Sequence, residues 1–115
     1  MSEEFDAQAL MERVDDDVEF LEETIEMLDD DAPGLLEEIR SAAASGDADA
    51  LVKPAHTLKG MLSNFCAAPA EAAAREVEMM GRQQRLAEVG PAVEALQGRT
   101  DRLREALHKF LRDRT

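Results

Sequence analysis

The chain has 115 residues, enough for one domain with a single hydrophobic core, and 44% of its residues are hydrophobic. Only 3% are aromatic, without Trp or Tyr, and this composition favours a helical bundle over a β-sheet. The net charge of −13 argues against nucleic acid and anionic membranes as partners. The single Cys66 cannot form an internal disulfide, and the N-terminal MSEEFD lacks the basic and apolar regions of a signal peptide. These features predict a cytoplasmic protein.

The first half of the chain predicts two helices, a short one over 4–12 and a long one over 17–45. Asp15 to Asp17 supply an N-cap and an acidic first turn for the long helix. Pro33 and Gly34 predict a kink or a short break within it. Gly46 suits the position after its last turn, and Asp47 suits the cap of the next helix.

The second half predicts three further helical segments. One runs from 48 to about 66 and contains Pro54, which predicts a bend. The next spans 70–81, with an extension towards Ala87, and Gly90-Pro91 marks a break or the opening of the last helix. Short connections imply antiparallel neighbours. We therefore predict an all-α fold, an antiparallel four-helix bundle with an additional short N-terminal helix, as a single domain over 1–115.

His56 is the candidate functional residue of this chain. On a helical wheel at about 100° per residue, its opposite pole holds Leu51, Pro54, Leu58, Met61, Leu62 and Phe65. The side around it holds Asp49, Val52, Lys53, Lys59, Gly60, Ser63 and Asn64. His56 is thus predicted to point to water, flanked by two of the three lysines and followed by glycine one turn later. This pattern suits a surface nucleophile that carries an anion and is approached closely.

Other kinds of site lack their required residues. The run at 29–34 resembles a calcium loop, but Pro33 and Arg40 stand where such a loop needs oxygen ligands. One Cys and two distant His cannot complete a zinc site, and the scattered glycines form no phosphate loop. Cys66 is predicted to be a partly buried, inert thiol, and His108 a plain surface histidine.

The charge is unevenly distributed along the chain. Residues 1–58 hold 18 acidic and three basic residues, a net of −15, whereas residues 59–115 have a net of +2. The simpler interpretation is a solvated acidic face packed beside an Arg-rich one. The alternative is a docking surface with a charge preference.

The segment 55–67, AHTLKGMLSNFCA, resembles the signature of histidine-containing phosphotransfer (HPt) domains. The matching positions are Ala55, His56, Leu58, Lys59, Gly60, Asn64 and Ala67. The stretch 77–82, VEMMGR, looks like the family's Leu-Glu-x-x-Gly-Arg-like stretch, and FDAQALMERV looks similar to family openings. The chain departs from the pattern at Cys66, which replaces a frequent Gly, and at Met61 and Leu62, which replace commoner small residues.

This resemblance implies a four-helix bundle that relays phosphoryl groups. His56 would accept a phosphoryl group from a receiver-domain aspartate, or from a sensor kinase, and pass it to another receiver aspartate. A neutral imidazole is nucleophilic, Lys59 can offset phosphoryl charge, and Gly60 lets a partner come close. Lys53 could offset charge from the other side. The expected partner interface comprises Val52, Lys53, Ser63 and Asn64.

The same resemblance sets the expected partners, which are response-regulator receiver domains and a sensor histidine kinase, simple or hybrid. Without a nucleotide site the chain is expected to be a phosphoryl carrier, not an autonomous kinase. We expect a monomer without cofactor or metal, to which the receiver brings Mg²⁺.

Two alternatives stay open. One is the phosphoacceptor domain of a chemotaxis-type kinase, although the commoner Gly after Lys-Gly is Met61 here. The other is an acidic helical-bundle interaction protein whose His56 is never phosphorylated.

Overall fold

The structure, a computed structural model, describes residues 3–114, so the ends of the predicted 1–115 domain, residues 1–2 and 115, lie outside the described residues. The elements are α1 (Ala7–Arg13), α2 (Val18–Ser45), α3 (Ala48–Asn64), α4 (Ala68–Arg82), the 3₁₀ turn η1 (Leu86–Glu88) and α5 (Val89–Arg114). Every regular element in the described part of the chain is helical, so the predicted all-α class is confirmed.

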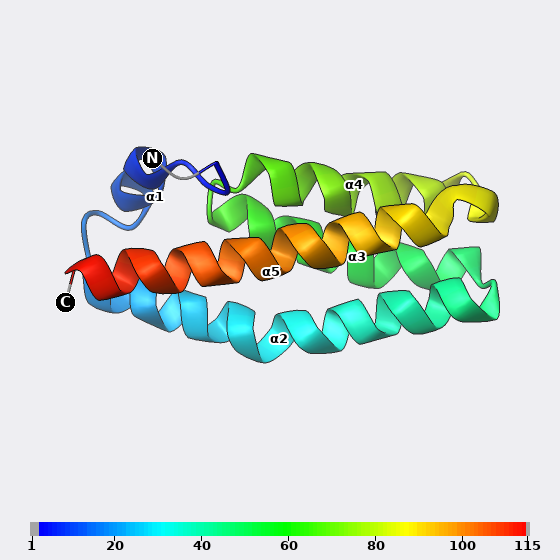
Figure 1. The fold of residues 1–115 in the computed structure, drawn as a ribbon, viewed down its shortest axis with the longest axis horizontal. Helices are drawn as coiled ribbons and strands as arrows, with labels where there is room; N and C mark the ends of the chain where they lie inside the picture. The colour runs from blue at the N-terminus through cyan, green and yellow to red at the C-terminus, as the bar shows by residue number, and fades with distance from the viewer. Residues whose placement is uncertain (1–2, 115) are drawn as a thin grey trace.

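The four long helices form an antiparallel bundle, as predicted (Figure 1). Each packs against two others, in the cyclic order α2, α3, α4 and α5. The short α1 lies at the end of the bundle where α5 finishes (Figure 1). None of the helices within residues 3–114 has the length and apolar character needed to cross a membrane.

Several helix ends follow the predicted capping residues. The Asp17 side chain accepts a hydrogen bond from the Phe20 backbone N–H, and Asp47 does the same for Ala50. Gly46 ends α2 with φ of 72°, the left-handed conformation that glycine adopts without strain. The first helix begins at Ala7, three residues later than predicted, because Asp6 caps it through the Ala9 N–H.

The structure also decides between the alternatives predicted at Pro33 and at Gly90-Pro91, and it places the ends of the third and fourth helices. Of the kink or short break predicted at Pro33, the kink is confirmed, because α2 runs unbroken and bends near its middle (Figure 1). The buried Ala32 and Leu36 on either side of the proline anchor both halves in the core. The third helix stops at Asn64, since Cys66 has φ of 55° and cannot continue it. The fourth helix, predicted over 70–81, spans Ala68–Arg82 without the extension towards Ala87. Gly90-Pro91 lies at the opening of α5, one of its two predicted alternatives.

The core is built from aliphatic residues of all four long helices. The predicted apolar face of α3 is buried at Leu51, Pro54, Leu58, Leu62 and Phe65, whereas Met61 is only half-buried. Helices α3 and α4 approach each other closely at Gly81 of α4. A Cβ atom there would lie 2.9 Å from the backbone oxygen of Ala48. This contact presses α4 against α3 and brings the side chains of the two helices together.

Candidate functional site around His56

His56 lies on the outer face of α3, and its side chain is 62% exposed. The residues two and six positions later, Leu58 and Leu62, are fully buried on the opposite side. The structure thus places the histidine at the surface, as the helical wheel predicts. Its ring is nevertheless held in position by a neighbour from α4.

That neighbour is Glu78, whose side chain is only 6% exposed. Its Oε2 lies 3.1 Å from His56 Nδ1, and its Oε1 lies 2.8 Å from Lys59 Nζ. Arg82, one turn later on α4, donates to the same Oε2 from Nε at 3.1 Å and Nη2 at 2.8 Å. We call His56, Lys59, Glu78 and Arg82 the His56 cluster.

The electrostatics of the His56 cluster fix the charge of Glu78. Burial raises the pKa of this carboxyl, but hydrogen bonds from Lys59, Arg82 and His56 outweigh burial and lower the pKa from 4.5 to about 2. Glu78 is therefore ionised at neutral pH and can only accept hydrogen bonds. His56 must then donate through Nδ1–H, so in the neutral ring the lone pair lies on Nε2.

The other predicted site residues lie along the same face of α3. Gly60 is exposed, and a Cβ atom there would meet nothing within 4 Å. Lys53 and Asn64 are exposed, while Val52 and Ser63 are half-buried. Lys59 contacts Glu78, whereas Lys53 is not among the residues that do so. The two lysines that flank His56 in the sequence therefore differ in their surroundings. Only Lys59 joins the His56 cluster.

A groove of about 370 Å³ continues this face towards α1 and α2. Asn64 and Met61 of α3 line one side of it. Phe20 and Met27 of α2 line the other, and they are 48% and 60% exposed. Within the described residues they are two of the three large hydrophobic side chains that are exposed, the third being Met79.

The second histidine, His108, also has a carboxylate neighbour, but there the carboxylate contacts Nε2 and not Nδ1. Its Nε2 lies 2.6 Å from Asp29 Oδ2, and Arg104 Nε lies 2.8 Å from Asp29 Oδ1. Burial raises the pKa of Asp29, but Arg104 and His108 outweigh it and lower the pKa. The Nε2 atom of His108 is thus occupied by a contact that links α5 to α2. Of the two ring nitrogens of His108, only Nδ1, which is nearer to Cβ, is not in contact with Asp29.

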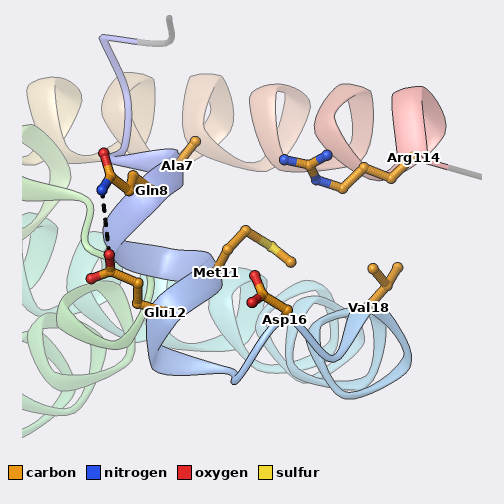
Figure 2. Close-up of a pocket in the computed structure, with 7 residues that line it drawn as sticks. All are labelled: Ala7, Gln8, Met11, Glu12, Asp16, Val18 and Arg114. Atoms are coloured by element: carbon orange, nitrogen blue, oxygen red, sulfur yellow. Dashed lines mark hydrogen bonds between the residues drawn. The ribbon is translucent and has the colours of Figure 1, made fainter.

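A wider cleft of about 730 Å³ lies at the α1 end of the bundle (Figure 2). Its lining residues are Ala7, Gln8, Met11, Glu12, Asp16, Val18 and Arg114. Gln8 Nε2 donates to Glu12 Oε1 at 3.3 Å on its wall. The cleft shares no residue with the His56 cluster, and its lining offers neither a histidine nor a cysteine as a nucleophile.

Sequence reasoning did not assign Glu78 and Arg82 to the site. Both stand in the stretch 77–82 that carried part of the family resemblance. A second signal was the helical spacing of Glu78 from Ala74, four residues earlier, and from Gly81, three residues later. Both of these residues are buried on α4 in the structure. A charged residue inside a buried stripe needs a partner, and the partners here come from α3.

Comparison with known families matches one family model to this chain. The model, described as Hpt domain, covers residues 6–106, a range that includes the whole His56 cluster. Comparisons with curated proteins and with solved structures gave no match.

Proposed function

This chain belongs to the Hpt domain family, whose members carry phosphoryl groups in two-component systems and are not autonomous kinases, and on that premise we propose that His56 is its phosphoacceptor. His56 receives the phosphoryl group from the aspartate of a receiver domain, or from a sensor kinase, and passes it to the aspartate of another receiver. The observation that carries this proposal is the contact between His56 Nδ1 and the buried Glu78 carboxylate.

That contact selects the reacting nitrogen. Since Nδ1 donates to Glu78, the Nε2 lone pair points outward from an exposed ring. An acyl phosphate brought in by a partner can meet this nitrogen without any movement of the bundle. Transfer of a phosphoryl group depends mainly on such positioning and on neutralisation of charge.

Lys59 and Gly60 supply the remaining requirements of the transfer. Lys59 is one turn from His56, and with its side chain 24% exposed it can contact solvent as well as Glu78. From there its ammonium offsets charge on the phosphoryl oxygens. Gly60 leaves open space on the same face, so the loops around a receiver aspartate can approach the ring.

The receiver docks on the α3 face that contains Val52, Lys53, Gly60, Ser63 and Asn64. The groove with exposed Phe20 and Met27 extends this face and supplies an apolar contact area. A mixed surface of this kind, with an apolar centre beside polar residues, is typical of transient protein interfaces. The receiver supplies Mg²⁺, and the chain acts as a cytoplasmic monomer without a cofactor of its own.

Transfer of label from a phosphorylated receiver tests this function. Wild-type protein is expected to take up radioactive phosphate in a form that is stable to alkali and labile to acid, as phosphohistidine is. A panel of receivers with Mg²⁺ should include at least one efficient donor. If the folded protein takes up no label from any receiver or sensor kinase, the chain is an acidic interaction bundle and not a carrier.

A further inference from the structure

Two grooves between α2 and α3 meet at Met61 and form one trough beside the His56 face. The first is the groove of about 370 Å³ that Phe20 and Met27 line. The second has a volume of about 320 Å³ and is lined by residues of α2 together with Thr57 and Met61 of α3. Thr57 directly follows His56 in the sequence, so the second groove lies next to the histidine on α3. We call the two grooves together the α2–α3 trough.

The α2 wall of this trough is a single stripe of residues spaced three or four positions apart. Such a spacing places side chains on one face of a helix. The members of the stripe are Phe20, Thr24, Met27, Asp31, Gly34 and Glu38. The first three line the groove near α1, and the last three line the groove near His56. The trough is therefore mainly apolar at one end and acidic at the other.

The carboxylates at the acidic end have no cation of their own. Asp31 and Glu38 are exposed, and within residues 3–114 neither side chain makes an ion pair or a hydrogen bond. Of the carboxylates of α2, Asp29 is paired, and its partners are on α5. Lys59 of α3 is directed at Glu78 on α4. The negative charge at the acidic end is therefore available to a partner.

Gly34 lies between the two carboxylates on the stripe. It is exposed in the middle of α2, and a Cβ atom there would meet nothing within 4 Å. Packing inside the described part of the chain therefore does not require a glycine here, although glycine is a poor helix former. The open space lets the backbone or a long side chain of a partner reach the helix between Asp31 and Glu38.

The charge of the trough limits what can occupy it. A partner that covers Asp31 and Glu38 removes water from them, and buried carboxylates need cations to pair with them. A second copy of this chain would bring further negative charge, since its net charge is −13. The occupant must instead combine apolar side chains with Lys or Arg. On the proposed function, the protein that approaches this side of His56 is a receiver domain.

We propose that the α2–α3 trough selects receivers by charge, and that Asp31 and Glu38 are the residues that make the selection. This inference rests on the proposed function. The receiver places apolar side chains against Phe20 and Met27, and Lys or Arg against the two carboxylates. A receiver with acidic or neutral residues at the second position leaves the carboxylates unpaired and is rejected. Because the two ends differ, the trough also sets the direction in which the receiver lies over His56.

Charge reversal at the trough tests this proposal with a receiver that labels wild type efficiently. The phosphorylated receiver is kept well below its half-saturating concentration, at physiological ionic strength. Asp31→Lys combined with Glu38→Lys should lower the rate of transfer by about tenfold or more. Both positions are exposed, so the variant should remain folded, as thermal melts can verify. If it does not fold, Asp31→Asn combined with Glu38→Gln takes its place and should slow transfer by about threefold or more.

The matched control is Glu22→Lys combined with Glu26→Lys, which makes the same change of net charge on the same helix. Glu22 and Glu26 are exposed and line neither groove of the trough. On a helical wheel they lie about 120° or more from the centre of the stripe. The control should change the rate by less than about threefold, because it alters only long-range attraction, which salt screens.

Reversal of charge in the receiver shows whether the contact is direct. Lys and Arg residues around the phosphorylated aspartate of that receiver are changed singly to Glu. At least one of these receivers should react slowly with wild type and recover part of the rate with the Asp31→Lys, Glu38→Lys protein. Recovery with none of them would contradict direct pairing.

The outcomes separate this inference from the proposed function. Equal losses in the trough variant and in the control would show that overall charge matters and the trough does not, which would overturn the inference. An unchanged rate in the trough variant would also overturn it, while continued transfer to His56 would leave the proposed function intact. If no receiver or sensor kinase labels wild type, the proposed function fails and the inference fails with it.

Discussion

His56 and Glu78 are 22 residues apart on different helices, yet His56 Nδ1 lies 3.1 Å from Glu78 Oε2. The contact depends on the close packing of α3 against α4, which Gly81 permits, three residues after Glu78. An exposed histidine and a buried carboxylate form one unit in which the orientation of the ring is set by the fold.

Stability towards acid should depend on Glu78. Because its pKa is lowered from 4.5 to about 2 in the folded protein, its contribution to stability is present above pH 4.5 and is lost as pH falls towards 2. The shift corresponds to a contribution of about 3 kcal/mol at neutral pH. Urea unfolding of wild type and Glu78→Gln should therefore show a large difference at pH 7 and a small one near pH 2. A difference that does not change with pH would contradict the paired, ionised carboxylate.

The two lysines beside His56 should differ in importance. Lys59→Ala is expected to slow phosphoryl transfer by about tenfold or more, because Lys59 lies in the cluster and can contact the phosphoryl oxygens. Lys53→Ala should slow transfer less than Lys59→Ala does, since Lys53 is not among the residues that contact Glu78. Lys59→Ala should also lower the free energy of unfolding, by about 1–3 kcal/mol, because it leaves a buried Oε1 without its cation. Single-turnover rates on samples shown to be folded decide the comparison, and equal rates for both variants would remove the role of Lys59.

Two glycines 21 positions apart should respond in opposite ways to a side chain. Gly60→Arg should be as stable as wild type or about 1 kcal/mol more stable, since the site is open and Gly is a poor helix former. It should nevertheless fail to exchange phosphoryl groups with a receiver. Gly81→Ala should lose about 1–3 kcal/mol, because its Cβ would press on the Ala48 backbone at 2.9 Å. Thermal melts and transfer rates on the same samples test both, and normal transfer by Gly60→Arg would show that the partner does not approach over this face.

The groove beside the His56 face should contribute to partner binding. Phe20→Ala combined with Met27→Ala is expected to weaken receiver binding by about tenfold or more, because both side chains are exposed and available to a partner. Stability should change by less than about 1 kcal/mol. Met79→Ala, which removes an exposed side chain on α4 away from this groove, is the matched control and should bind normally. Calorimetric titration with a receiver gives the affinities, and unchanged affinity in the double variant would exclude the groove from the interface.

The sequence predicted most of the fold because its helix ends have local causes. A capping residue interacts with backbone groups only a few positions away in the sequence. The caps at Asp17, Gly46 and Asp47 accordingly appear where expected. The outward position of His56 followed in the same way from the spacing of apolar residues on one helix. Pro33 was harder to place, since whether a proline breaks a helix depends on how well the core anchors both sides of it.

The partners of His56 could not be derived in this way. Glu78 is 22 positions away, and its approach to the ring depends on how closely two helices pack. A helical wheel describes a single helix and contains no such information. On that wheel Lys53 and Lys59 lie at equal angles on either side of His56. Only the position of the α4 carboxylate, which contacts Lys59, distinguishes them.

Locating the phosphoryl group tests whether His56 is the phosphoacceptor. Wild type, His56→Gln and His108→Gln are each incubated with the same phosphorylated receiver, and NMR of the labelled protein identifies the phosphorylated nitrogen. This assignment predicts one phosphoryl group on His56 Nε2 in wild type and in His108→Gln, and none in His56→Gln, which should remain folded because the side chain is exposed. Label on His56→Gln, or a phosphoryl group on Nδ1 of His56, would contradict it.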